Sequence, residues 1–187
     1  VSERYGAAVS DGLFMASRDG QTFTRWNEAF IRPGLRPVGS WAYGDCYQGW
    51  GLLETSSQIA GAPNELSFFA TEGYWRDSAN AIRRYTLRID GFVSVNATRK
   101  GGELITKPFT FDGGRLALNI ATSAAGSARV EVLTAAGQPL EKFRLEDCDD
   151  IIGDTLDYTV RWHAGADLRS LAGRPVRLRF VLADADL

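Results

Sequence analysis

The sequence has few of the side chains from which metal centres and catalytic triads are built. It contains one histidine, His163, and two cysteines, Cys46 and Cys148, which lie far apart along the chain. A zinc site of ordinary ligand spacing is therefore excluded, and a Ser-His-Asp triad is disfavoured. The sequence leaves a disulfide open without implying one, and we favour two buried or free thiols. We expect no cofactor and no metal.

Strong charge and long apolar runs are also missing. The formal net charge is −2, so neither a nucleic acid nor an anionic membrane is expected as a partner. No apolar run approaches the roughly 20 residues of a membrane-spanning helix. The N-terminal stretch VSERYGAAVS lacks the apolar core of a signal peptide, but because the chain begins with valine this says little about compartment.

Helical periodicity is almost absent, and only the segment 167–172 predicts a helical turn. Asp-Gly pairs between apolar or β-branched runs instead indicate tight hairpins. The pairs at 19–20 and 90–91 each predict such a hairpin, with Val93 and Val95 on the buried face of the second. In the first half, strands are predicted at 12–17, 22–26, 50–55, 65–72, 83–90 and 92–98.

The polar, glycine-containing stretch RKGGE at residues 99–103 is the predicted module boundary. Beyond it, short runs with one apolar face are typical of an antiparallel β-sandwich. These runs are 115–121, 128–133, 141–146, 157–162 and 174–182.

The predicted architecture is all-β with two modules. The strands before the boundary would make about one and a half blades of a β-propeller, and a closed propeller needs at least about four. We therefore interpret residues 1–98 as the closing blades of a partial β-propeller and residues 99–187 as a β-sandwich. The chain stops at ADADL, directly after its strongest strand, which suggests that a final strand is missing.

Several segments carry a resemblance to a known family. They are SRDGQTF, WAYGDCYQGWGLLET, NELSFFATEGYW, RRYTLRIDGFVSV, SAAGSARVEV and PVRLRFVLADADL, and they extend over nearly the whole chain. In this order they resemble the C-terminal part of bacterial family-32-like glycoside hydrolases. The resemblance implies a five-bladed β-propeller followed by a β-sandwich, and a carbohydrate substrate.

The catalytic motifs of that family do not occur in this sequence. Its carboxylates lie in earlier blades, in Asn-Asp-Pro, Arg-Asp-Pro and Glu-Cys motifs. The stretch Gly44-Asp45-Cys46 is similar to the Glu-Cys motif, but it has aspartate for glutamate and follows in a late blade. Glycoside hydrolysis needs a matched pair of carboxylates, and the partner is missing. We therefore assign no catalytic residue and expect the chain alone to be inactive.

Two segments are candidates for contact with a glycan. Sugar rings present apolar C–H faces and a rim of hydroxyls, which suit aromatic planes beside carboxylates or amides. Segments 40–51 and 71–78 combine these groups, although Trp41 and Trp50 would equally suit the space between blades. The predicted substrate-binding residues are Trp41, Tyr43, Asp45, Tyr47, Trp50, Glu72, Tyr74 and Trp75.

Other charged segments are expected to be structural or solvated. The acidic segment 146–154 lacks the spacing of an EF-hand, so we interpret it as a solvated loop. Arg83 and Arg84 begin a strand, one on each face, and are interpreted as structural. Arg76 and Asp77 are interpreted as a surface ion pair.

The leading functional hypothesis is the C-terminal portion of a carbohydrate-active, glycoside-hydrolase-like protein. The chain would contribute pocket loops and a bracing sandwich, with an oligo- or polysaccharide and the missing N-terminal blades of the same protein as partners. A secreted or periplasmic location would follow from the resemblance. The alternative is a non-catalytic carbohydrate-binding or interaction module that uses the sandwich. Tyr158 and Trp162 lie on the apolar side of their strand, which weakens that alternative.

Overall fold

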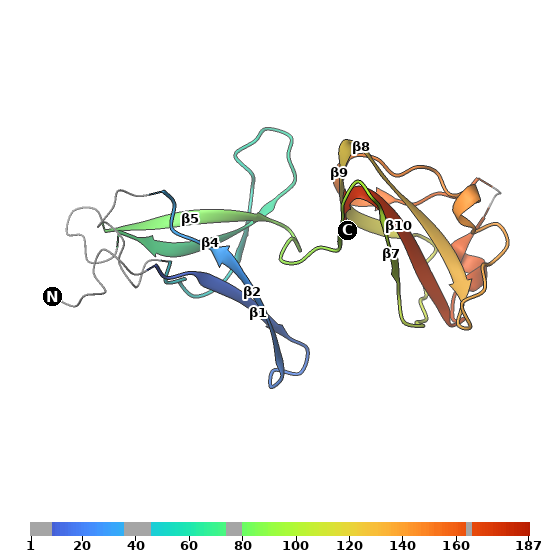
Figure 1. The fold of residues 1–187 in the computed structure, drawn as a ribbon, viewed down its shortest axis with the longest axis horizontal. Coiled ribbons are helices and arrows are strands. Elements are labelled where there is room, and N and C mark those ends of the chain that lie inside the picture. The colour runs from blue at the N-terminus through green and yellow to red at the C-terminus, as the bar shows by residue number, and fades with distance from the viewer. Residues whose placement is uncertain (1–8, 36–45, 74–79, 164–165) are drawn as a thin grey trace. The chain divides into compact units, whose positions relative to one another are not determined.

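The computed structural model describes residues 9–35, 46–73, 80–163 and 166–187 (Figure 1). Over these residues the chain is all-β, as predicted, with three antiparallel sheets, none of them closed. It divides into two compact units, Val1–Phe92 and Val93–Leu187, so the division falls N-terminal to the predicted boundary. Within the described ranges, no helix has the length and apolar character needed to cross a membrane.

The first unit contains two sheets. Strands β1 (Gly12–Ser17) and β2 (Phe23–Ile31) form an antiparallel hairpin. Strands β3 (Leu53–Thr55), β4 (Glu65–Glu72) and β5 (Ala81–Arg88) form a three-stranded antiparallel sheet in that order.

The hairpin between β1 and β2 turns at Asp19 and Gly20, as predicted. Gly20 has φ 73°, a conformation that favours glycine. The Asp19 carboxylate accepts hydrogen bonds from the N–H groups of Gln21 (2.9 Å) and Thr22 (2.7 Å) and from the Ser17 hydroxyl (2.8 Å). These bonds to the charged form hold the pKa of Asp19 well below its usual range. Asp19 is therefore a turn residue.

A row of aromatic rings runs from the hairpin to the three-stranded sheet, and Phe30 of the hairpin stacks on Phe68 of β4. The ring centroids of Phe14 and Phe30 lie 5.5 Å apart, those of Phe30 and Phe68 5.8 Å, and those of Phe68 and Tyr85 5.5 Å. Spacings of this size are favourable for aromatic pairs. The buried cluster here is small, and its members are Ile31, Cys46, Phe68 and Ala70.

The second unit is built on two long strands, β8 (Ala117–Thr134) and β10 (Val176–Asp186). Its sheet has the order β6–β10–β8–β9, and β7 also pairs with β10. The shorter strands are β6 (Asn96–Ala97), β7 (Gly102–Ile105) and β9 (Asp154–Thr159). Two short 3-10 helices complete the described elements, η2 (Leu145–Asp147) and η3 (Leu168–Leu171).

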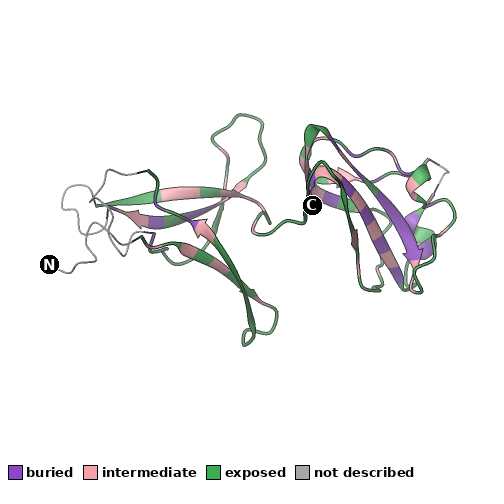
Figure 2. Cartoon of the chain, in the orientation of Figure 1, coloured by how far each residue is buried: buried purple, intermediate pink, exposed green. Residues whose placement is uncertain are grey.

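The core of the second unit follows the alternation of the sequence. In β10, the side chains of Val176, Leu178, Phe180 and Leu182 are buried while the intervening residues are only partly covered. Buried residues gather along β8 and β10 in Figure 2, whereas the first unit is largely exposed or half-buried. The predicted helical turn is confirmed as η3, and the Asp167 carboxylate accepts the Arg169 N–H at its start.

The predicted second hairpin at Asp90-Gly91 is wrong. Strand β5 pairs with β4, and the residues after Gly91 pair with the C-terminal part of the chain, where Val95 and Leu187 exchange backbone hydrogen bonds. Val93 and Val95 are consequently exposed instead of lining a buried face. The turn itself is displaced, because Gly91 donates to the carbonyl of Arg88 and so occupies the last position of the turn.

The predicted strand at 141–146 is also wrong. Lys142 has φ 69°, which no regular strand accommodates, and the backbone continues into η2. Phe143 is buried nonetheless and meets Trp162 edge to face at 5.5 Å. The two runs predicted at 115–121 and 128–133 belong to one continuous strand, β8.

Candidate functional site

The first candidate segment lies along the edge of β4. The N–H of Cys46 donates to the carbonyl of Thr71 (2.8 Å), and the N–H of Thr71 donates to the carbonyl of Tyr47 (3.0 Å). Cys46 and Tyr47 thus both oppose Thr71, which is the arrangement of a β-bulge. The first residue of the bulge, Cys46, has φ 66°. The bulge places the Cys46 side chain in the small buried cluster.

Tyr47 and Trp50 are displayed on the surface. Tyr47 is 56% exposed and Trp50 is 104% exposed. The sequence left open whether Trp50 fills space between blades, and in this structure its side chain is fully exposed. Two aromatic side chains on one short segment therefore offer an exposed apolar surface with a polar handle.

Glu72 ends β4 and is held by two partners from β5. Its Oε1 accepts the Tyr85 hydroxyl at 2.8 Å and lies 2.6 Å from Nε of Arg83. Burial, together with the hydrogen bond to the Glu72 carboxylate, raises the pKa of Tyr85 to about 12. The hydrogen bond to Glu72 also raises the pKa of Arg83. This arrangement presents Glu72 as an oriented hydrogen-bond acceptor.

The sequence predicts a structural role for Arg83 but does not reveal its contact with Glu72. This contact depends on the register between β4 and β5, which the sequence alone does not supply. The remaining predicted site residues, Trp41, Tyr43, Asp45, Tyr74 and Trp75, lie outside the described residues. The structure therefore places Tyr47, Trp50 and Glu72 and leaves the other predicted contacts as predictions.

Polar side chains gather around Arg84 on the opposite face of the β3–β4–β5 sheet, which we call the polar face. Arg84 donates to Ser67 Oγ (2.8 Å), Thr55 Oγ1 (3.0 Å) and Glu65 Oε1 (2.8 Å). Ser67 is fully buried beneath this network. A hollow of about 370 Å³ opens beside Glu65 and Arg84.

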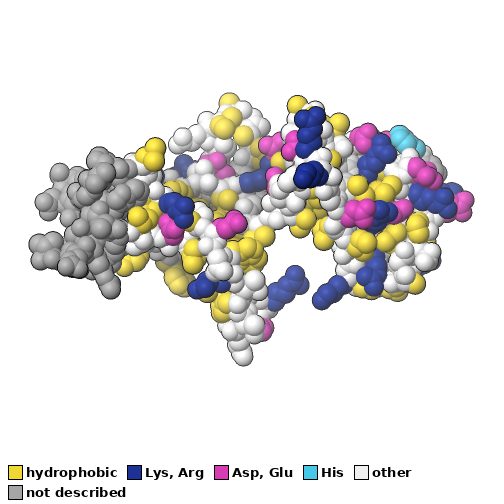
Figure 3. Space-filling view, viewed as in Figure 1, with side chains coloured by type: hydrophobic (Ala, Val, Ile, Leu, Met, Phe, Trp, Pro, Cys, Tyr) yellow, Lys and Arg dark blue, Asp and Glu magenta, His cyan; other side chains and the backbone are white. Residues whose placement is uncertain are grey.

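Two carboxylates of the acidic loop of the second unit contact basic side chains. Arg129 binds Asp150 through two nitrogens, at 2.6 and 3.1 Å, and Nε2 of His163 lies 2.8 Å from Asp149. Figure 3 shows the histidine beside acidic side chains on this surface. Burial raises the pKa of the neighbouring Cys148 thiol. In the described part of the chain no group of side chains could hold a metal ion.

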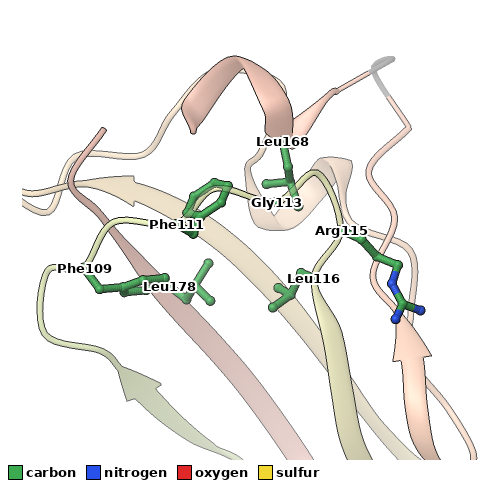
Figure 4. A pocket seen from close by; sticks show the side chains of 7 residues that line it. All are labelled: Phe109, Phe111, Gly113, Arg115, Leu116, Leu168 and Leu178. Atoms are coloured by element: carbon green, nitrogen blue, oxygen red, sulfur yellow. The ribbon is translucent and has the colours of Figure 1, made fainter. Parts of the chain in front are cut away.

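A second hollow, of about 150 Å³, is apolar and lies within the second unit (Figure 4). Phe109, Phe111, Leu116 and Leu178 form much of its wall. Arg115 stands at its rim, but its Nη1 is engaged by Asp157 (3.1 Å) and Thr159. Tyr158 and Trp162, the aromatics that a sandwich-based binding site would need, belong to the core of this unit.

Within the described residues, the Arg83–Glu72 and Arg84–Glu65 pairs thus lie on opposite faces of the β3–β4–β5 sheet. Comparisons with protein-family models, with curated proteins and with solved structures gave no match to this sequence.

Proposed function

We propose that the chain is the C-terminal portion of a carbohydrate-active, glycoside-hydrolase-like protein. In this proposal the first unit represents closing blades of a β-propeller, and the second unit is a bracing β-sandwich. The observation that carries the proposal is the pair of exposed aromatics, Tyr47 and Trp50, on a segment whose backbone pairs with Thr71 of β4, the residue that precedes the fixed carboxylate of Glu72. Exposed aromatic planes suit the apolar faces of sugars, and an oriented acceptor suits their hydroxyl rims.

The hairpin of the first unit supports the propeller part of the proposal. Its two strands pair with each other, and Leu13, Met15, Phe23 and Trp26 are each more than a third exposed. A two-stranded hairpin is marginal in water unless further strands or another layer cover it. Neighbouring blades would supply that cover.

Binding to immobilised polysaccharide tests the proposal. The 187-residue chain is run by affinity electrophoresis through gels containing levan, inulin or arabinan, with Trp50→Ala and Tyr47→Ala as variants. Each variant should weaken retardation about fivefold, since an aromatic contact contributes about 1 kcal/mol. Leu35→Ala is the matched control, because Leu35 is as exposed as Trp50, at 105% against 104%. The proposal would be refuted if the unaltered chain and both aromatic variants were retarded equally. It would also be refuted if no polysaccharide retarded the unaltered chain.

Catalysis is tested separately. We expect no turnover of fructosides or arabinosides by this chain, because the recognisable catalytic pair is missing from the sequence. Clear turnover that is abolished by Asp45→Asn would contradict this expectation and would assign the acid role to Asp45.

A further inference from the structure

The hollow on the polar face of the β3–β4–β5 sheet is a second candidate site. Side chains alternate along a strand, so Glu65 and Ser67 of β4 lie on the face opposite to Glu72. Its volume of about 370 Å³ falls within the range of roughly 300–1,000 Å³ that is typical of small-molecule sites. The hollow is lined by Ser57, Gln58, Ile59, Glu65, Arg84 and Thr86.

The floor of the hollow is fixed by hydrogen bonds. Arg84 uses Nε for Ser67, and it uses Nη2 for Thr55 and Glu65, at distances between 2.8 and 3.0 Å. The hydroxyls of Thr55 and Ser67 are also 2.8 Å apart. A guanidinium held at three points loses little further side-chain freedom when a ligand binds.

Unused hydrogen-bonding groups remain at this position. Nη1 of Arg84 and Oε2 of Glu65 have no partner among the residues that the structure describes. The Gln58 amide and the Thr86 hydroxyl, which also line the hollow, make no side-chain hydrogen bond within the same ranges. Donors and an acceptor thus stand side by side, which suits a ligand whose adjacent groups can each donate and accept.

Charge and shape select the class of ligand. The charged residues of the lining are one arginine and one glutamate, 2.8 Å apart, so the hollow offers no excess charge to an ion. Two neighbouring hydroxyls could donate to Glu65 and accept from Arg84 at once. Ile59, which is 73% exposed, offers an apolar contact for a C–H face. We propose that this hollow binds a neutral polyhydroxylated ligand, with the size and chemistry of one sugar ring.

This inference does not rest on the proposed function. It uses the face of the sheet opposite to Glu72, and it stands whether or not the Tyr47–Trp50 segment binds a glycan. The two ideas fail in different experiments, because Trp50→Ala tests one and Glu65→Gln tests the other.

The test is an NMR titration of the ¹⁵N-labelled 187-residue chain with D-glucose, D-galactose, L-arabinose and D-fructose, and with sodium sulfate as the anionic probe. At least one sugar should give saturable shifts centred on the amides of Ile59 and Thr86, while sulfate should not. Glu65→Gln keeps the size of the side chain but removes its charge, and should weaken binding about tenfold. Ile59→Ala should weaken it by a smaller factor.

Ile82→Ala is the matched control for Ile59→Ala. Ile82 is 75% exposed, against 73% for Ile59, and it does not line the hollow, so this variant should bind as the unaltered chain does. Unchanged amide positions elsewhere in the spectrum verify that each variant is folded. Sugar shifts that do not saturate, shifts centred elsewhere, saturable binding of sulfate alone, or an undiminished affinity in Glu65→Gln would each overturn the proposal.

Discussion

Gly126 lies in β8 where this strand passes a bulge of β10. The register of the two strands shifts between Ala183 and Ala185, and the intervening Asp184 has φ 48°. A Cβ at position 126 would overlap the carbonyl oxygen of Asp184 and would stand 2.8 Å from that of Ala183. Both contacts are with backbone atoms, so no rotamer change relieves them. Gly126→Ala must therefore displace one of the two central strands of the second unit.

We expect Gly126→Ala to destabilise the second unit by about 2 kcal/mol. Forced overpacking typically costs about 1–3 kcal/mol, and this outweighs the gain of about 0.4–1 kcal/mol from a less flexible unfolded chain. Gly113→Ala is the control, because a Cβ there meets nothing within 4 Å. That variant should be neutral or slightly more stable.

The assay is urea unfolding of the whole chain, followed through resolved amide signals of β8 and β10. Gly126→Ala should lower the midpoint without changing the slope, because the surface exposed on unfolding stays the same. If the two variants have equal midpoints, the close approach of β8 to the β10 bulge is not a feature of the protein, and the reasoning fails.

Two further predictions concern charged groups. Tyr85 should titrate near pH 12, because its pKa is raised to about 12 by burial and by the Glu72 carboxylate; ultraviolet titration with Tyr85→Phe as reference checks this. Since the folded pKa lies above the unfolded value of about 10, the stabilisation by this group is complete below about pH 10 and is lost as the pH rises toward 12. Arg179→Met should destabilise the second unit by about 1–3 kcal/mol, because it strands the buried Glu131, which lies 3.1 Å from Arg179. The same substitution should raise the pKa of Glu103, which Arg179 holds below its usual range. NMR titration of the side-chain carboxyls of both proteins measures this pKa, and an unchanged value would contradict the prediction.

The parts of the fold that could be predicted from the sequence are those set by local pattern. Alternation in 176–182 gave the buried face of β10, and Asp19-Gly20 gave the first hairpin. The prediction of a hairpin at Asp90-Gly91 is wrong because the residues on either side of this turn pair with strands that are distant in sequence. The edge of β10 pairs with β6 through Ala185 and Ala97, so long-range pairing decided what a local turn signal could not.

The candidate site shows the same division. The exposed aromatics Tyr47 and Trp50 and the carboxylate of Glu72 were identified from residue type and position after a strand. The sequence correctly predicts Arg83 and Arg84 on opposite faces of their strand. Which carboxylate each arginine meets depends on how β4 and β5 are aligned, and no pattern within either strand specifies that alignment.

The alignment of β4 with β5 therefore controls both candidate sites at once. Arg83 and Arg84 are neighbours in sequence, yet Arg83 holds Glu72 on the face that carries Phe68 and Tyr85, and Arg84 holds Glu65 on the polar face. A slip of one residue would move each arginine to the wrong face and separate it from its partner. Phe68 and Tyr85 are directly paired in the register and stack at 5.5 Å with an interplanar angle of 10°, and a slip would break this contact. The aromatic pair that joins the two strands thus also determines which acid each arginine binds.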